Sequence, residues 1–268
     1  MVQEIHSFDA YIDFINEISE NPQYADPHFL CDRENLFGAL QKKDQKAYIV
    51  SRHGKTKGLF VWLFCTDEKY IEMMIGLTAS KEVFSEMLNF IFEQYRGCKI
   101  DFVVNPDNHV ICEHLREIGA AFAKEQQRMV YKQEVPFDST LQVELLSEKW
   151  EKPYCALHHL DTYWTAEKIL AAKDRFRTFI AIADQQIIGY IDVTYCFEEN
   201  EPYDLYVKEE YRHKGYEIAL LKEALKYNKP NRMMALVDVD SEDEITIFSA
   251  AGFEAIEGQN SIYASYRS

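Results

Sequence analysis

The residues that point most clearly to chemistry form a polar turn, residues 208–215, which ends in Arg212, His213, Lys214 and Gly215. We call this segment the basic turn. The first N–H groups of a helix have no partner inside the helix, and the helix dipole places partial positive charge there. Glycine lets a ligand approach the backbone closely, and the basic side chains add charge. If a helix follows the turn, the sequence therefore predicts an anion site here.

The residues on either side of the basic turn predict a strand before it and a helix after it. Residues 203–207 alternate as in a strand, with Tyr203, Leu205 and Val207 on one face. The helix after the turn has an apolar side formed by Ile218, Leu221 and Leu225. This strand, turn and helix context makes the motif more specific than its glycine alone.

The same stretch, in which Val207 is followed by Arg212-His213-Lys214-Gly215-Tyr216-Glu217, resembles the acyl-CoA-binding motif of the GCN5-related N-acetyltransferases, the GNAT superfamily. The resemblance implies acetyl-CoA as co-substrate, with its pyrophosphate held by backbone amides of the turn. The residues that it assigns to acetyl-CoA are Tyr206, Val207, Arg212, His213, Lys214, Gly215, Tyr216 and Glu217. Glu217 departs from the family pattern, which has glycine or alanine there, and its carboxylate is expected close to the pyrophosphate.

Composition limits the partners and the compartment. The 268 residues are 47% hydrophobic with a formal net charge of −16, so the chain can bury a substantial core and has no general basic surface for nucleic acid. Six cysteines without a C-x-x-C pair, and the lack of a long apolar run, predict a cytoplasmic protein without signal peptide or membrane span. The acidic charge favours a cationic acceptor.

The chain divides into two halves with the same order of elements. The polar segment 133–140 predicts a linker between domains at 1–132 and 141–268. Residues that recur at an offset of about 130 are Val103-Val104-Asn105 with Gly119, and Leu236-Val237-Asp238 with Gly252. The order predicts an α/β (α+β) fold with a mixed, mostly antiparallel sheet and helices on both faces in each half. Together with the basic turn, it resembles two tandem GNAT domains.

The first half lacks the basic turn. Helices are predicted over residues 1–20 and from Asn105-Pro106 onwards, and Ser80 is predicted to cap another. The connection at residues 76–81 is too short to hold a pyrophosphate, so the first half is interpreted as a degenerate copy. It either forms part of the acceptor pocket or is only a structural partner, and the sequence favours neither.

Acetyl transfer to an amine needs a polarised carbonyl and a base that removes the amine proton. By the resemblance, the backbone of Tyr206 and Val207 contacts the acyl group beside a β-bulge. Asp204 is the candidate base, because it lies on a strand expected to flank the acyl gap. Asp192 and Tyr203 on the same strands remain alternatives.

The leaving thiolate benefits from an acid. The tyrosine that usually supplies it in the resembling family is replaced by Phe248, which has no proton to give. Tyr216 is the candidate acid in its place, with Tyr263 as an alternative.

A metal site is not expected. His158, His159 and Asp161 lie close in sequence, but adjacent residues on a helix point in different directions. The sequence therefore predicts an enzyme that depends on acetyl-CoA alone.

The interpretation is an acetyl-CoA-dependent N-acetyltransferase that acts on a primary amine of a small molecule or peptide, as a monomer or homodimer. Glu217 and Phe248 motivate the alternative, a non-catalytic CoA-binding or scaffold protein with a degenerate GNAT fold. A third possibility is an oligomer-forming structural protein with a large apolar surface patch.

Overall fold

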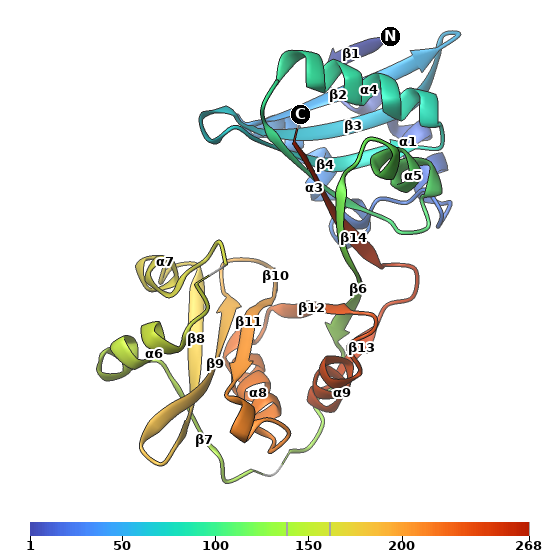
Figure 1. The fold of residues 1–268 in the computed structure, drawn as a ribbon. Helices are drawn as coiled ribbons and strands as arrows, with labels where there is room; N and C mark the ends of the chain where they lie inside the picture. Colours follow the sequence, from blue (N-terminus) through green and yellow to red (C-terminus); the bar gives the residue numbers. More distant parts are fainter. Residues whose placement is uncertain (138, 161, 268) are drawn as a thin grey trace. The chain divides into compact units, whose positions relative to one another are not determined.

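The computed structural model describes residues 1–137, 139–160 and 162–267, which form two compact units (Figure 1). Unit 1 comprises Met1–Gln127 together with the chain from Glu257 onwards, and unit 2 comprises Arg128–Ile256. These units differ from the predicted domains 1–132 and 141–268, because the C-terminal strand belongs to unit 1. The predicted linker, 133–140, lies inside unit 2, apart from Asp138, which is outside the described residues.

Unit 1 contains five α-helices and seven strands within its described residues, including part of β6. Its strands are β1 (Val2–Ile5), β2 (Gln45–Arg52), β3 (Lys55–Cys65), β4 (Tyr70–Thr78), β5 (Lys99–Val104), β6 (Ala121–Tyr131) and β14 (Ser261–Arg267). Its α-helices are α1 (Ile12–Ser19), α2 (Pro27–Cys31), α3 (Glu34–Phe37), α4 (Lys81–Gln94) and α5 (His109–Glu117).

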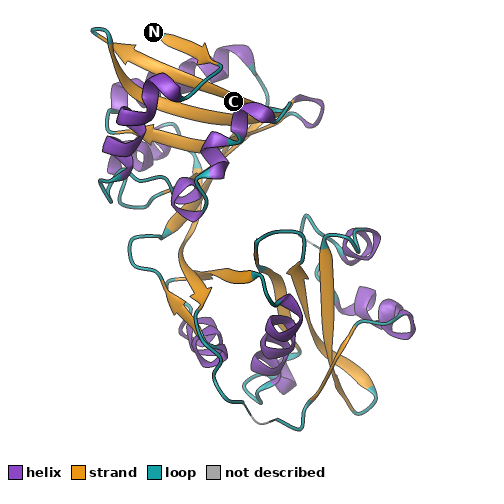
Figure 2. Ribbon diagram, turned by 180° about the vertical axis from the view of Figure 1, so that it is seen from behind, coloured by secondary structure: helices purple, strands orange, loops and turns teal. Residues whose placement is uncertain are grey.

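The unit 1 strands form one mixed sheet in the order β1-β2-β3-β4-β5-β14-β6. The neighbours are antiparallel except β4 and β5, which run parallel and pair over Tyr70–Met73. Helices α4 and α5 bury one face of the sheet, and α1, α2 and α3 bury the other (Figures 1 and 2). This confirms the predicted mixed sheet with helices on both faces.

Two helix boundaries in unit 1 differ from the prediction. Residues 1–20 begin as strand β1, paired with β2, before α1 starts at Ile12. The helix predicted from Asn105-Pro106 starts at His109, because Asn108 accepts the N–H of Ile111 and acts as the N-cap. The predicted cap at Ser80 is confirmed, since its hydroxyl accepts the N–H of Val83 at 3.4 Å.

Unit 2 repeats this plan with different strands. Its remaining strands are β7 (Gln142–Leu145), β8 (Phe176–Ala183), β9 (Gln186–Thr194), β10 (Glu199–Asn200), β11 (Pro202–Val207), β12 (Arg232–Asp238) and β13 (Phe253–Ala255). Its α-helices are α6 (Glu151–Leu157), α7 (Ala166–Ala171), α8 (Tyr216–Asn228) and α9 (Glu242–Ala251).

The unit 2 strands fall into two groups. Strands β11-β9-β8-β7 form an antiparallel sheet, while β12 pairs with β10 and lies next to β6. Helices α8 and α9 bury one face, and α6 and α7 bury the other. Each unit therefore has the predicted layering.

Strand β6 explains why the unit boundaries differ from the predicted domains. Its first part pairs with β14 inside unit 1, where Ser261 lies opposite Gln126. Its last part pairs with β13 inside unit 2, where Phe253 lies opposite Tyr131. Each unit thus completes its sheet with a strand from the other half of the sequence.

No helix among the described residues combines the length and the hydropathy needed to cross a bilayer.

Candidate functional site

The neighbouring strands of unit 2 separate at a break between β10 and β11. Asn200 pairs with Met233 of β12, but from Pro202 onwards the chain pairs with β9 instead. Proline has no N–H to donate, and the register with β9 shifts between Pro202 and Asp204, which marks a bulge at Tyr203. In the described part of the chain, β11 pairs with β9 alone, so its other edge has no strand partner.

The direction of the backbone groups on β11 follows from the next residue along the chain. The N–H of Lys208 donates to the carbonyl of Ile188 on β9 at 2.8 Å. Backbone groups alternate in direction along a strand, so the N–H of Tyr206 points to β9. The N–H groups of Leu205 and Val207 point to the free edge of β11. Of the two backbone contacts expected at the acyl gap, Val207 can therefore supply one, and Leu205 replaces Tyr206.

Unit 1 has the same bulge, but its free edge is filled. In unit 1, Gly58 of β3 pairs with Thr78 of β4, and in unit 2, Gly189 of β9 pairs with Val207 of β11. Two residues before these partners, Gly76 of β4 corresponds to Leu205 of β11. The N–H of Gly76 donates to Asp26 Oδ2 at 2.8 Å. The neighbouring carbonyl, that of Met74, lies 2.8 Å from His28 Nδ1. Residues 21–29, which we call the Asp26 segment, thus occupy this edge.

The Asp26 segment is fixed from both sides. Asp26 also accepts the N–H groups of His28 and Phe29, and burial raises the pKa of its carboxyl although His28 opposes the shift. Asn105, at the end of β5, donates to the carbonyls of Pro22 at 2.7 Å and Ala25 at 3.1 Å. Asn105 therefore fastens the segment, in addition to accepting an N–H in its own turn.

The basic turn connects β11 to α8, as predicted. It contains a short 3-10 helix, Glu209–Tyr211, and α8 begins at Tyr216. His213 has φ +58° and Gly215 has φ +88°, the left-handed region that glycine adopts without strain. Such turns direct successive N–H groups to one side and form concave anion sites.

The carboxylate of Glu217 lies in this turn. Its Oε1 accepts the N–H of His213 at 3.3 Å, and the residue is only 6% exposed. Arg212 pairs with Glu209 at 3.2 Å and with Asp243 at 3.7 Å. The basic groups of the turn are therefore partly neutralised by acids of the same unit.

The candidate acid Tyr216 lies apart from the candidate base Asp204. Tyr216 packs edge-on against Tyr211, with ring centroids 5.9 Å apart, on the face buried by α8. Asp204 accepts a hydrogen bond from the hydroxyl of Tyr190, which belongs to the core on the face of α6 and α7. The structure therefore does not bring these two side chains together.

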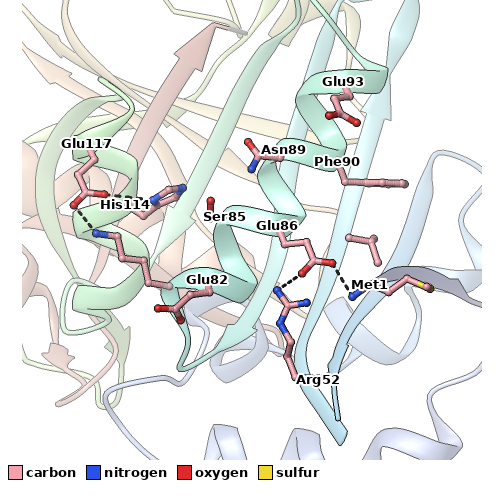
Figure 3. A pocket seen from close by; sticks show the side chains of 12 residues that line it. Met1, Arg52, Glu82, Ser85, Glu86, Asn89, Phe90, Glu93, His114 and Glu117 are labelled. Atoms are coloured by element: carbon pink, nitrogen blue, oxygen red, sulfur yellow. Dashed lines mark hydrogen bonds and ion pairs between the residues drawn. The ribbon is translucent and has the colours of Figure 1, made fainter. Parts of the chain in front are cut away.

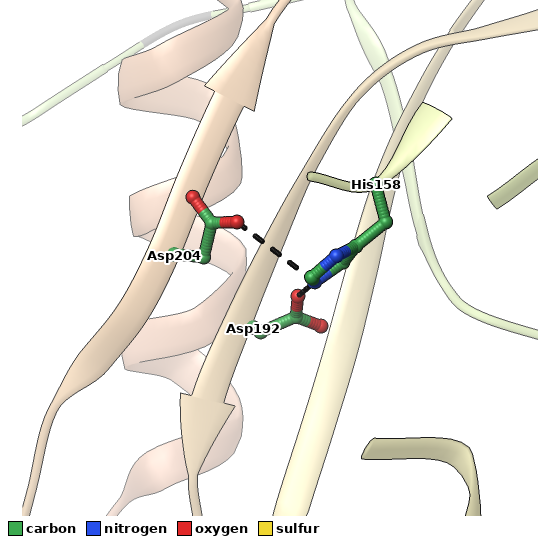
Figure 4. A group of neighbouring side chains, drawn as sticks. All are labelled: His158, Asp192 and Asp204. Atoms are coloured by element: carbon green, nitrogen blue, oxygen red, sulfur yellow. Dashed lines mark hydrogen bonds and ion pairs between the residues drawn. The ribbon is translucent and has the colours of Figure 1, made fainter. Parts of the chain in front are cut away.

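Asp204 belongs to a buried polar cluster with His158 and Asp192 (Figure 4). His158 Nε2 lies 3.2 Å from Asp192 Oδ2 and 3.8 Å from Asp204 Oδ2. The side chains of His158 and Asp192 are 1% and 0% exposed, whereas that of Asp204 is 19% exposed. Asp204 is thus the member of the cluster that solvent or a ligand can reach.

The surroundings of His158 favour its protonated form. His158 Nδ1 lies 2.8 Å from the carbonyl of His159, which can only accept, so this nitrogen carries a proton. Burial lowers the pKa of His158, but hydrogen bonds to Asp192 and to that carbonyl, with the charges of both aspartates, raise it overall. Burial raises the pKa of Asp192 despite the hydrogen bonds that it accepts from His158, Thr178 and Tyr154. The raised pKa of both His158 and Asp192 favours a proton held between these two groups.

The cluster offers a nitrogen and two oxygens within 4.8 Å of one another, which is a possible ligand set for a cation. Its carboxylate oxygens already accept hydrogen bonds from the hydroxyls of Tyr154, Thr178 and Tyr190, so the protein itself satisfies them. Asp161, considered from the sequence, lies outside the described residues. The arrangement fits proton handling better than metal binding.

Glu201 is a titratable residue that the sequence interpretation missed. It lies at the break between β10 and β11, is partly buried, and burial raises the pKa of its carboxyl. Its backbone is fixed by Thr194, whose N–H and hydroxyl bond to it. The available signal was the Glu201-Pro202 pair, because a proline inside a strand pattern marks a break where a side chain is redirected.

The two other aromatic positions considered for an acid, Phe248 and Tyr263, each have contacts of their own. Phe248 is 8% exposed and packs edge-on against Phe253, with ring centroids 5.1 Å apart. Tyr263 belongs to β14 and therefore to unit 1, where its hydroxyl accepts from Lys99 at 2.9 Å.

A cavity of about 770 Å³ lies on unit 1, between α4 and α5 and next to Arg52 (Figure 3). Four glutamates line it, and two of them are engaged in ion pairs, Glu86 with Arg52 and Glu117 with Lys81. Its basic groups, Arg52, Lys81 and the N-terminal amine, are thus already paired with glutamates of the same lining. It is also separate from the bulge on β4.

Comparison with known proteins agrees with this architecture. Residues 174–255 match the family model described as Acetyltransferase (GNAT) domain. A tandem GNAT protein from the clavulanic acid biosynthesis pathway aligns with TM-score 0.53 and 10% identity over 100% of this chain and 98% of its own. An acetyltransferase of the GNAT family from Colwellia psychrerythraea aligns with TM-score 0.53 and 11% identity over 100% of both chains.

A GCN5-related N-acetyltransferase from Sphaerobacter thermophilus aligns with TM-score 0.60 and 10% identity over 82% of this chain and 80% of its own. At such identities the likeness concerns the fold. No curated protein sequence matches the chain. Residues 174–255 thus match the model of a GNAT acetyltransferase domain, and the chain has the fold of tandem GNAT proteins, as the sequence motif predicted.

Proposed function

We propose that the chain is an acetyl-CoA-dependent N-acetyltransferase and that unit 2 carries out the reaction. The observation that carries this proposal is the free edge of β11, where the N–H groups of Leu205 and Val207 face no strand of the described residues. Such donors can bind the pantetheine arm and the thioester carbonyl. They stabilise the negative charge that develops on this oxygen during acyl transfer.

The other end of acetyl-CoA is assigned to the basic turn. The backbone N–H groups of Lys214 and Gly215 lie at the start of α8, where the helix dipole favours an anion, beside the N–H of His213 that Glu217 accepts. Arg212 supplies a nearby cationic side chain. The turn and the free edge of β11 are joined through Val207, so one extended ligand can reach both.

The acceptor is a primary amine of a small molecule or peptide, and Asp204 or Glu201 takes its proton. The amine nitrogen attacks the thioester carbon, the C–S bond breaks, and the thiolate of CoA leaves and is protonated. The formal net charge of −16 of the chain favours a cationic amine. Burial suits Glu201 to this role, because it raises the pKa of the carboxyl towards the working range of a base.

Two experiments on the full chain test this function in sequence. Calorimetric titration with acetyl-CoA should show binding, and no binding at high micromolar concentration would contradict the enzyme assignment. A panel of amines should then release free thiol in the presence of acetyl-CoA. Binding without thiol release from any amine would favour the non-catalytic, CoA-binding alternative.

We also assign the protein to the cytoplasm, as a monomer or homodimer. None of the six cysteines, all of which lie in the described part of the chain, forms a disulfide, which suits a reducing compartment. Size-exclusion chromatography with light scattering measures the oligomeric state directly.

A further inference from the structure

We propose that Glu217 is a built-in competitor for the diphosphate of acetyl-CoA, so that unit 2 selects its donor by the acylated pantetheine arm and not by the nucleotide. This inference rests on the proposed function, because it concerns the same donor site. It goes beyond that function in naming which part of the donor is recognised.

The position of the Glu217 carboxylate is the first support. Glu217 is only 6% exposed, and its carboxylate is directed back at the basic turn, where Oε1 accepts the N–H of His213. This is an N–H that an external anion at the turn would otherwise take. A buried carboxylate in the first turn of α8 also interacts favourably with the helix dipole. The site is thus stabilised with its own anion in place.

The charges around the turn are the second support. Arg212 is held by Glu209 and Asp243, and His213 Nε2 lies 3.7 Å from Asp243. The guanidinium of Arg212 is therefore already matched by carboxylates, and Glu217 places a further, buried carboxylate beside the same turn. An incoming diphosphate meets negative charge here and must displace an existing contact.

The packing against Gly215 is the third support. A Cβ placed on Gly215 would lie 3.5 Å from the ring of Phe137 and 3.7 Å from Leu141. Apolar side chains therefore cover part of the turn where the sequence predicted free access. A diphosphate has no hydrogen-bond donor to gain from these two residues.

The free edge of β11 is unaffected by these contacts. The N–H groups of Leu205 and Val207 are available to the amides and thioester of a pantetheine arm. The diphosphate should then add little to donor affinity. Acetyl-CoA and S-acetyl-pantetheine are expected to bind the native chain with dissociation constants within about threefold of each other.

The test is a calorimetric cycle with these two donors on the native chain and on Glu217→Ala. Removing the carboxylate should tighten acetyl-CoA about tenfold or more and change S-acetyl-pantetheine by less than about twofold. Glu217→Gln keeps the shape without the charge and should give an intermediate gain. This second variant covers the case in which the alanine variant does not fold.

Glu210→Ala is the matched control, because it removes an exposed carboxylate from the same turn and leaves the His213 contact in place. It should change acetyl-CoA affinity by less than about twofold, given screening at an exposed site. If the native chain binds acetyl-CoA about 100-fold tighter than S-acetyl-pantetheine and Glu217→Ala changes nothing, the inference is overturned while the proposed function stands. If neither donor binds any variant, both are overturned.

Discussion

Strands β4 of unit 1 and β11 of unit 2 are equivalent, and they are used in opposite ways. Strand β4 has a bulge at Met74 and strand β11 has a bulge at Tyr203. At each bulge, one edge of the strand loses its neighbouring strand. In unit 1 the N–H of Gly76 is taken by Asp26, while in unit 2 the corresponding N–H of Leu205 faces an open edge. The fold thus provides the same free strand edge twice, and the surrounding loops determine at which edge a ligand can bind.

The connections that follow these strands show the same contrast. In unit 1, β4 ends at Thr78 and α4 starts at Lys81, with Ser80 capping the helix. In unit 2, eight residues, 208–215, separate β11 from α8. A side-chain cap satisfies the N–H groups that an anion would need, so the short connection closes the site in unit 1. The longer one leaves room for regulation by a residue such as Glu217.

The largest effect is expected from the carboxylates beside β11. Glu201→Gln and Asp204→Asn should each lower kcat about 100-fold if that residue takes the amine proton, with acetyl-CoA affinity little changed. Because burial raises the pKa of Glu201, kcat/KM should rise with pH through a value above the ordinary one for glutamate, and Glu201→Gln should remove this limb. Steady-state kinetics across pH measures both effects.

The matched control lies in unit 1. Glu72 precedes the bulge at Met74 by two residues, as Glu201 precedes that at Tyr203, and it accepts a hydrogen bond from Tyr70. Glu72→Gln should leave kcat within about twofold, because the proposed reaction is in unit 2. Loss of activity in this variant alone would reverse the assignment of the two units.

A second effect concerns stability and should appear in unit 1. Asp26→Ala leaves two buried N–H groups and one partly buried N–H group without their acceptor, and the free energy of unfolding should fall by roughly 2–4 kcal/mol. Asp32→Ala removes an exposed aspartate that accepts one N–H, and should cost less than about 1 kcal/mol. Urea denaturation measures both. Equal losses would show that the Asp26 segment does not hold the edge of β4.

A third effect is the pH dependence of unit 2. The folded-state pKa of His158 is raised, so its stabilising contribution is complete below its unfolded pKa of about 6.5 and is lost as pH rises through the folded value. The native chain should therefore lose roughly 1 kcal/mol relative to His158→Gln as pH increases above this range. Denaturation midpoints at several pH values test this. A constant difference between the two proteins would mean that His158 is not cationic.

The smallest effect is expected at the position of the missing acid. Phe248→Tyr should change kcat by less than about threefold, because the ring is buried against Phe253. The added hydroxyl should cost about 1 kcal/mol of stability unless it finds a partner. A gain of about tenfold, with a new acid limb in the pH profile, would show that this ring reaches the leaving thiolate.

Much of the fold follows from local patterns. The alternation at residues 203–207 and the glycine at position 215 predicted the strand, the turn and the start of α8, because these depend on near neighbours. The exchange of β14 into unit 1 could not be predicted in this way. Alternation identifies a strand and its buried face, but not which strand it pairs with.

The site was predictable only in part for the same reason. The basic turn and Asp204 were identified from residue types, yet the contact of Glu217 with His213 depends on how one side chain folds back. His158 approaches Asp204 from a segment 46 positions earlier in the chain. Helix starts are likewise ambiguous where two capping residues, Asn105 and Asn108, lie three positions apart.

The most direct test of the difference between the two units is amide NMR of the 15N-labelled chain titrated with acetyl-CoA. The signals of Leu205 and Val207 should shift and gain protection from hydrogen exchange, while that of Gly76 stays in place and is protected from the start. A shift at Gly76 with none at Leu205 and Val207 would contradict the assignment of the donor site to unit 2.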